Sequence, residues 1–197
     1  MSVDHLGFIR QFARSLLRTG AVLPSSSRLA RTMISQADLH TSDTVLELGP
    51  GNGCVTENIL DYLPEGARFL ALEINPVFAE ATRLRCPTVD VAVGDAADAR
   101  RHLSERGLDG IDLVISGLPW ASFSSQLQDR LLAAVQDVLR PGGRFTTFAY
   151  VQGMLLPPAR RFEKRLRAEF PLVRRTKVVW RNLPPAFAYV ATKAPAT

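Results

Sequence analysis

The chain has 197 residues, 46% of them hydrophobic, which is enough for one ordinary core and predicts a single domain over residues 1–197. No apolar run approaches the ~20 residues of a membrane-spanning helix. The only cysteines, Cys54 and Cys86, are too few for a disulfide framework. These features argue against an integral membrane protein and a disulfide-stabilised secreted domain. No secretory signal is evident, so a cytoplasmic protein with reduced thiols is expected.

The net charge of +5 is unevenly distributed along the chain. Residues 1–43 carry a net charge of +2, residues 44–150 carry −5 and residues 151–197 carry +8. An acidic body with basic ends predicts that the ends contact an anionic partner, although charge that serves only solubility gives the same pattern.

The chain begins with two expected helices, which together form an N-terminal region over residues 1–40. Residues 5–19 are amphipathic, because Arg10, Arg14 and Arg18 recur every four residues beside an apolar stripe. Gly20 ends this helix, and the serines that follow predict the cap of a second helix over residues 27–37. The main body of the domain is expected to follow over residues 41–197.

From residue 44 onward, strand and helix patterns alternate. Short apolar runs predict strands at 44–48, 68–73, 89–93, 111–116 and 143–150. Helical patterns separate them at 53–63, 76–84, 96–105 and 124–139. This alternation predicts an α/β fold with a parallel sheet that is covered by helices on both faces.

The last part of the core has a different pattern. A basic helix is expected around residues 159–169, and two strand patterns follow within residues 174–180 and 186–192. Residues 182–185 separate these two strands. They predict an antiparallel hairpin that closes one edge of the sheet.

The stretch "LELGPGNG" places Gly49, Gly51 and Gly53 between a strand and a helix, where α/β proteins bind nucleotide-like ligands. The dinucleotide fingerprint would need a fourth glycine at the position of Cys54. The glycines alone are therefore weak evidence, because ordinary tight turns also use glycine.

Three acidic residues at successive strand ends strengthen the ligand interpretation. Glu47 precedes the glycines, where a negative charge suits a cationic ligand better than a phosphate. Glu73 ends the second strand, where an acid can accept from ribose hydroxyls, and Asp95 follows the third strand, where it can accept from an adenine amine. A positive centre, a ribose and an adenine together describe S-adenosylmethionine.

The stretches "VLELGPGNG", "ALEIN" and "VGDA" resemble those of class I S-adenosylmethionine-dependent methyltransferases. The resemblance implies a Rossmann-like seven-stranded sheet with an antiparallel last strand, helices on both faces and extra helices at the N-terminus. It also implies a cofactor site lined by Glu47, Gly49, Gly51, Gly53, Glu73, Ile74, Asp95 and Ala96.

The stretch after the fourth strand is expected to hold the methyl acceptor through Ser116, Gly117, Leu118, Pro119 and Trp120. Backbone carbonyls on a proline-stiffened loop can accept the hydrogens of an amine and orient its lone pair. The aromatic ring at Trp120 can cover a cation with its face. The alternative interpretation is a strand-end turn with a buried tryptophan.

Ribosomal RNA adenine dimethyltransferases have Asn-(Ile/Leu)-Pro-(Tyr/Phe) at this loop, whereas this chain has no asparagine there. The whole chain instead resembles bacterial phospholipid N-methyltransferases, through "GAVLPSSSRLARTM", "SGLPW" and "WRNLPPAFAYVATK". The resemblance implies methylation of phosphatidylethanolamine towards phosphatidylcholine, with Tyr189 and Arg181 as head-group contacts. Ornithine-lipid N-methyltransferases share every one of these features and remain an alternative, as do an RNA-type enzyme and a catalytically idle adaptor.

The expected partners are an anionic membrane surface and a phospholipid, with the enzyme a monomer attached peripherally to the membrane. Nucleic acid is not an expected partner. No metal is expected, because the histidines are scattered and no Cys/His cluster has ligand spacing. The anionic surface would meet residues 5–19 and the basic tail, whose cations are Arg160, Arg161, Lys164, Arg165, Arg167, Arg174, Arg175 and Lys177.

Overall fold

The computed structural model describes residues 24–196. The predicted amphipathic helix over residues 5–19, with Arg10, Arg14 and Arg18, lies outside the described residues. The second predicted helix is present as α2, Pro24–Gln36, and begins three residues earlier than its sequence pattern indicated.

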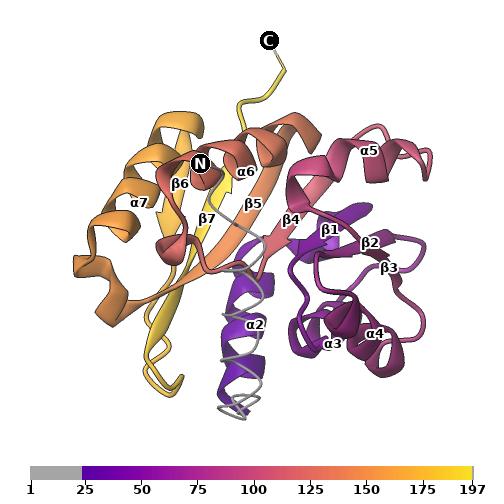
Figure 1. Cartoon of the computed structure of the whole chain (residues 1–197), viewed down its shortest axis with the longest axis horizontal. Helices are drawn as coiled ribbons and strands as arrows, with labels where there is room; N and C mark the ends of the chain where they lie inside the picture. The colour runs from indigo at the N-terminus through magenta and orange to yellow at the C-terminus, as the bar shows by residue number, and fades with distance from the viewer. Residues whose placement is uncertain (1–23, 197) are drawn as a thin grey trace, which may run out of the picture.

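The described chain forms one mixed seven-stranded sheet in the order β3-β2-β1-β4-β5-β7-β6 (Figure 1). Strands β1 to β5 are parallel, and β7 is antiparallel to both of its neighbours. The expected Rossmann-like sheet with an antiparallel last strand is therefore confirmed. The strands are β1 Thr44–Leu48, β2 Arg68–Glu73, β3 Asp90–Val93, β4 Ile111–Ser116, β5 Leu139–Tyr150, β6 Leu172–Arg175 and β7 Ala186–Thr192.

The predicted C-terminal hairpin is present, but β7 lies inside the sheet between β5 and β6. Its first six residues are fully buried, as the apolar sequence "AFAYVA" requires of an internal strand. Strand β6 is short and mostly exposed, which suits the edge position that it takes. It ends at Arg175, so residues 176–185 form a loop that is longer than the sequence indicated.

Helices cover both faces of the sheet (Figure 1). Helices α5, α6 and α7 pack on one face around a core that includes Leu46, Leu72 and Phe145. Helices α2, α3 and α4 pack on the other face, around Val45, Ile115 and Ala71. The bounds of the remaining helices are α3 Cys54–Leu60, α4 Pro76–Arg85, α5 Ala99–Ser104, α6 Ser125–Val138 and α7 Pro157–Glu169, with short 3-10 turns η1 Leu39–Thr41, η2 Ala96–Asp98, η3 Trp120–Ser122 and η4 Val151–Leu155.

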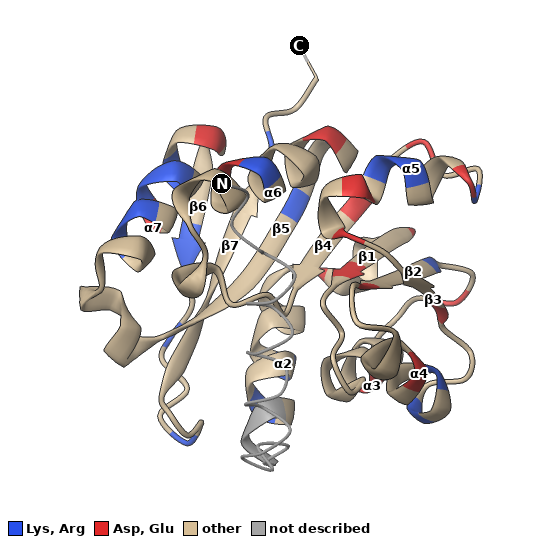
Figure 2. Ribbon diagram, in the orientation of Figure 1, with Lys and Arg blue, Asp and Glu red and all other residues tan. Residues whose placement is uncertain are grey.

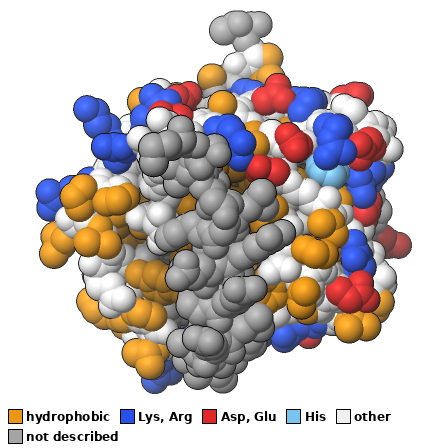
Figure 3. Space-filling model, in the orientation of Figure 1, with side chains coloured by type: hydrophobic (Ala, Val, Ile, Leu, Met, Phe, Trp, Pro, Cys, Tyr) orange, Lys and Arg blue, Asp and Glu red, His pale blue; other side chains and the backbone are white. Residues whose placement is uncertain are grey.

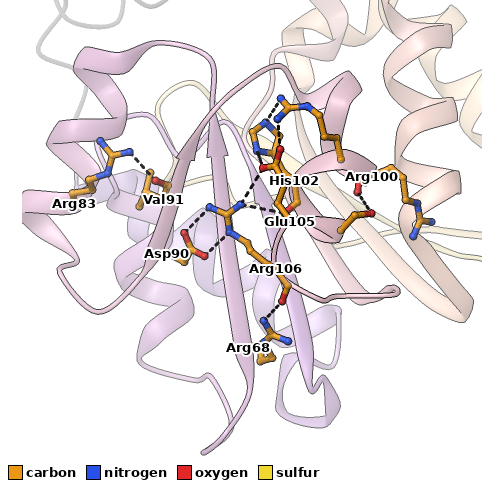
Figure 4. A network of polar contacts seen from close by, with 10 residues as sticks. Arg68, Arg83, Asp90, Val91, Arg100, His102, Glu105 and Arg106 are labelled. Carbon is orange, nitrogen blue, oxygen red and sulfur yellow. Dashed lines mark hydrogen bonds and ion pairs between the residues drawn. The ribbon is translucent and has the colours of Figure 1, made fainter.

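A polar network fixes α5 against the outer strands (Figure 4). Arg106 follows α5 and forms an ion pair with Asp90 at the start of β3, with a 2.5 Å contact. Arg68 of β2 donates to the carbonyl of Arg106 over 2.6 Å. His102 of α5 lies so close to Gly94 that a Cβ there would meet its Nε2 atom at 2.1 Å. These contacts pack α5 and the residues after it against both ends of β3 and the start of β2.

Charge is segregated in the folded molecule as it is along the chain. Figure 2 shows basic residues concentrated on α7 and β6, while acidic residues are spread over the half that contains β1, β2 and β3. The basic tail therefore forms one side of the molecule, next to strands β5 and β7.

Candidate cofactor and acceptor site

Three glycines align the carboxyl ends of the central strands. Each directly follows a strand and donates its backbone N–H to a carbonyl at the end of the neighbouring strand: Gly49 to Leu72 over 2.9 Å, Gly94 to Glu73 over 2.9 Å and Gly117 to Leu48 over 2.8 Å. The segments that follow β1, β2, β3 and β4 therefore lie side by side at one edge, where open α/β sheets bind their ligands.

The turn after β1 needs glycine for its backbone conformation. Gly49, Gly51 and Gly53 have φ values of 72°, 63° and 79°, in the left-handed region that strains other residues. Helix α4 supports this turn from behind, because Thr82 donates its hydroxyl to the carbonyl of Gly51 over 2.8 Å. The tight turn leaves backbone rather than side chains facing the edge.

Glu47 lies on β1 and points toward α3. Its side chain is completely buried. One oxygen, Oε2, accepts a 2.7 Å hydrogen bond from Thr56, whereas the buried Oε1 has no partner among the described residues. Burial raises the pKa of Glu47 to about 8; the Thr56 hydrogen bond opposes this rise and the charge of Glu73 adds to it. The unpaired Oε1 fits a site for a cationic group.

Glu73 ties the end of β2 to the glycine turn. Its Oε2 accepts from the N–H of Gly51 over 3.1 Å, and its Oε1 accepts from the N–H of Asn75 over 2.9 Å. Burial raises the pKa of Glu73, and these backbone hydrogen bonds oppose the rise. Each carboxylate oxygen has a second lone pair, so the side chain can still accept from a hydroxyl of a bound ligand.

Both carboxylate oxygens of Asp95 already have partners within the chain, which the sequence did not indicate. Its Oδ1 caps η2 by accepting from the N–H of Ala97 over 2.9 Å. Its Oδ2 forms a 2.6 Å ion pair with Arg130 of α6, a residue that no sequence pattern near Asp95 pointed to. Ile74 and Ala96 are half-buried beside Glu73 and Asp95.

The acceptor loop and the glycine turn touch each other. A Cβ built on Gly117 would lie 2.6 Å from the carbonyl oxygen of Gly49, and a Cβ on Gly49 would lie 2.7 Å from Leu118. Ser116 shapes the loop, because its buried hydroxyl accepts from the N–H of Leu118 over 3.2 Å and from the indole of Trp120 over 3.0 Å.

Trp120 belongs to the hydrophobic core. Its ring is 2% exposed and stacks on Phe162 at a centroid distance of 4.7 Å. The edges of Phe145 and Phe123 lie against it at 5.7 and 6.1 Å. That Trp120 covers a substrate cation therefore stays a prediction; in this structure the ring is packed against other aromatic rings.

The backbone carbonyls of the loop differ in their availability. The carbonyl of Leu118 accepts from the N–H of Trp120 over 3.0 Å, and that of Pro119 accepts from Ser122 over 2.8 Å. Within residues 24–196 no hydrogen bond reaches the carbonyl of Gly117, a partly exposed residue that lies against the glycine turn. This carbonyl is the loop atom best able to accept from a substrate amine.

The two predicted head-group contacts lie in different environments. Tyr189 is 1% exposed, its hydroxyl lies 3.6 Å from the sulfur of Met154, and burial raises its pKa to about 12. That Tyr189 contacts a head group stays a prediction; in this structure its ring lies inside the core. Arg181 is exposed on the loop before β7 and remains a candidate.

The structure adds supporting residues that sequence reasoning missed. Thr56 holds Glu47, Thr82 holds the glycine turn, and Arg130 neutralises Asp95. The sequence signal for Thr56 was a hydroxyl side chain in the first turn of the helix that follows the glycine turn. Arg130 lies 35 residues after Asp95, a separation that carries no local pattern.

Neither a metal site nor a membrane span was found in the described part of the chain. Residues 24–196 contain no group of three metal-ligating side chains. None of the helices described is long and apolar enough to cross a bilayer.

Comparison with known proteins assigns the family. Residues 45–143 match the family described as methyltransferase domain. An ornithine lipid N-methyltransferase from Singulisphaera acidiphila is 34% identical over 189 residues, and the match covers 94% of each chain. Ribosomal RNA small subunit methyltransferase A from Chlamydia muridarum is 31% identical over 93 residues, which are 47% of this chain and 32% of that protein.

Solved structures show the same fold. The O-methyltransferase from Bacillus cereus, solved in complex with SAH, matches with a TM-score of 0.69 at 18% identity, covering 92% of this chain and 90% of that one. The O-methyltransferase TomG from Streptomyces achromogenes, solved in complex with SAM, gives a TM-score of 0.67 at 19% identity, covering 94% and 89%. With its glycine turn, its acidic strand ends and these matches, the chain belongs to the class I S-adenosylmethionine-dependent methyltransferases.

Proposed function

We propose that this methyltransferase transfers methyl groups from S-adenosylmethionine to the head-group nitrogen of a membrane aminolipid, and that ornithine lipids are its preferred acceptors. The observation that carries the proposal is the match to an ornithine lipid N-methyltransferase over 94% of both chains. That match includes the basic tail and most of the N-terminal region, which lie beyond the shared methyltransferase domain at residues 45–143. It favours the ornithine-lipid alternative over phosphatidylethanolamine.

The site residues have properties that fit the cofactor. The glycine turn leaves room for backbone contacts, and the unpaired Oε1 of Glu47 would balance a positive charge. Glu73 would accept from ribose hydroxyls with its remaining lone pairs. Asp95 would accept from the adenine amine while it keeps its cap, which requires Arg130 to share or release its second oxygen.

When bound, S-adenosylmethionine supplies a methyl group on a positively charged sulfur. The acceptor nitrogen must arrive uncharged, with its lone pair free. The carbonyl of Gly117 would accept one of its hydrogens and so direct the lone pair toward the methyl group. An amine that gains a methyl group in this way would become positively charged and would then release one of its protons to solvent. Positioning carries most of this reaction, and no obligatory acid or base is assigned.

Gly117 also bears on the choice between a lipid amine and an adenine. It occupies the position where ribosomal RNA enzymes of this type carry asparagine. A Cβ at residue 117 would approach the Gly49 carbonyl to 2.6 Å, a contact with backbone that cannot simply rotate away. The loop therefore has no room for an asparagine side chain in its present position, which supports an acceptor held by backbone alone.

The proposal is tested by incubating the purified enzyme with labelled S-adenosylmethionine and one acceptor at a time. The acceptors are vesicles that contain ornithine lipid, vesicles that contain phosphatidylethanolamine, and ribosomal RNA, with products identified by mass. We expect ornithine lipid to be labelled fastest. Labelled RNA with unlabelled lipids would overturn the proposal. Tight cofactor binding with no labelled product from any acceptor would favour the adaptor interpretation.

A further inference from the structure

Two segments that are joined to the end of β5 expose large hydrophobic side chains. Leu155 ends η4 and Leu156 follows it just before α7; they are 76% and 52% exposed. Trp180 and Leu183 lie in the loop before β7 and are 72% and 74% exposed. We call these four residues the apolar edge. Figure 3 shows hydrophobic side chains gathered at the left and lower left of the molecule, where Figure 1 draws the start of α7 and the loop before β7.

The two loops are joined at their base. The N–H of Val151 donates to the carbonyl of Pro185 over 2.9 Å, and Tyr150 pairs with Ala186 in the β5–β7 ladder. The same strand reaches the acceptor loop, because Thr147 donates its hydroxyl to the carbonyl of Ser116 over 3.1 Å. The apolar edge is therefore built onto the end of β5, a few residues beyond the contact with the acceptor loop.

Hydrogen bonds from Asn182 brace the loop that carries Trp180 and Leu183. Asn182 between them is 4% exposed. Its side-chain amide donates to the carbonyl of Pro184 over 2.6 Å, and its backbone N–H donates to the carbonyl of Val179 over 3.0 Å. An ordered loop that buries its asparagine and presents its tryptophan to solvent indicates a surface for contact.

The two chain segments that carry the apolar edge have only basic residues among their charged side chains. Residues 150–162 and 170–196 contain no aspartate or glutamate. Three arginines of the basic tail have acidic partners, since Arg165 pairs with Asp129 and Arg167 and Arg175 pair with Glu163. The other cations of this side form no ion pair with a described residue; they are Arg160, Arg161, Lys164, Arg174, Lys177 and Arg181.

We propose that the apolar edge is the surface through which the enzyme docks on an anionic lipid bilayer. Surfaces that insert into the headgroup region of a bilayer typically combine tryptophan and leucine side chains with arginine and lysine side chains that have no acidic partner. This inference rests on the proposed lipid acceptor and gives it a route: docking would place the end of β5, and with it the acceptor loop, against the headgroups. Residues 1–23, a second copy of this chain and another protein are the competing occupants.

The test uses the full-length enzyme and sucrose-loaded vesicles of phosphatidylcholine with or without phosphatidylglycerol. The test variant is Trp180→Ser with Leu183→Ser. The matched control is Leu84→Ser on α4, a leucine that is 77% exposed and outside the two loops. We expect co-sedimentation of the test variant with anionic vesicles to weaken about tenfold or more, because two large apolar side chains no longer insert. The control should bind like the wild type.

Tryptophan fluorescence supplies a second measurement. Trp120 is buried and Trp180 is exposed, so a change on adding vesicles reports mainly on Trp180. Docking should shift the emission of the wild type to shorter wavelength and protect it from acrylamide. Unchanged emission and quenching, or test and control variants that bind equally well, would overturn the proposal. A concentration-dependent dimer that the test variant abolishes, without vesicle binding, would assign the edge to a second copy instead.

A soluble acceptor separates docking from the proposed function. Given a short-chain ornithine lipid below its critical micelle concentration, the test variant should methylate as fast as the wild type while losing activity on vesicles. Loss on both would place these side chains in the reaction itself and would overturn the docking role. No methylation of either lipid form by wild type that still binds vesicles would refute the proposed function but leave the docking surface standing.

Discussion

Glu47 is completely buried, and among residues 24–196 only one of its two carboxylate oxygens has a hydrogen-bond partner. Its pKa of about 8 lies above the usual 4.5, so the folded protein holds the proton more tightly than the unfolded protein does. The contribution of protonated Glu47 to the stability of the folded protein is fully present below pH ~4.5 and is lost as the pH rises through about 8. We therefore compare the wild type with Glu47→Gln, both without cofactor. As the pH rises from ~4.5 to about 8, the melting temperature of the wild type should fall relative to that of the variant.

Scanning calorimetry from pH 4.5 to 9 measures this difference. The same variant should bind S-adenosylmethionine more weakly, because it lacks the negative charge that a cationic ligand would meet. A melting-temperature difference that stays constant with pH would show that Glu47 is ionised in the folded protein throughout the range.

Glu73 holds the glycine turn and is proposed to hold the ribose. Glu73→Ala should weaken S-adenosylmethionine binding by roughly 1.5–3 kcal/mol, as measured by titration calorimetry, because hydrogen bonds to a charged group are lost. Glu80→Ala is the control, since Glu80 is an exposed acid on α4 that pairs with Arg83. Equal affinities for wild type and Glu73→Ala would remove this residue from the cofactor site.

At the scale of elements, the acceptor loop and the glycine turn act as one unit because they touch at Gly49 and Gly117. Gly117→Ala would push them apart, since its Cβ would meet the Gly49 carbonyl at 2.6 Å. We expect kcat/KM to fall about 100-fold, the scale that a displacement of reacting groups can produce. Gly153→Ala is the control, because a Cβ there meets no atom within 4 Å. A Gly117→Ala enzyme as active as the wild type would show that the acceptor loop and the glycine turn can move apart without loss of activity.

The aromatic cluster around Trp120 joins the acceptor loop to α7. Trp120→Ala removes a buried ring that stacks on Phe162, and should cost roughly 3–5 kcal/mol in the free energy of unfolding, measured by denaturant titration. Trp120→Phe should recover most of that loss. If Trp120→Ala were as stable as the wild type and slowed only the later methylations, the ring would after all act on the substrate.

At the scale of the whole molecule, unpaired cations gather on one side. Replacing Lys177 and Arg181 with glutamine should weaken binding to anionic vesicles and make it less sensitive to salt, because exposed charges are screened over ~8 Å at physiological ionic strength. The control replaces Arg83 and Arg101, which are already paired with Glu80 and Glu105. Co-sedimentation at two salt concentrations measures both effects. If the test and control variants lost equal amounts of vesicle binding, the net charge of the protein, and not the position of these two cations, would explain the result.

The sequence by itself determined the fold class and the positions of its main elements. Strand β1 and the glycine turn are readable because burial on both faces and left-handed φ values each demand particular residue types, as "TVLEL" and Gly49 show. Glu47 and Glu73 were identified for the same local reason. A carboxylate at the end of a buried strand has few roles other than to hold a ligand or a neighbouring loop.

Tertiary structure alone decided the surroundings of the other candidates. Trp120 and Tyr189 look like substrate contacts in sequence. In the structure, Phe162 of α7 packs against both rings and Arg175 of β6 lies over Tyr189. Arg130 reaches Asp95 only once α6 lies beside η2. The position of β7 between β5 and β6 also depends on strand pairing between distant residues. Such contacts join segments far apart in the chain, and no local periodicity encodes them.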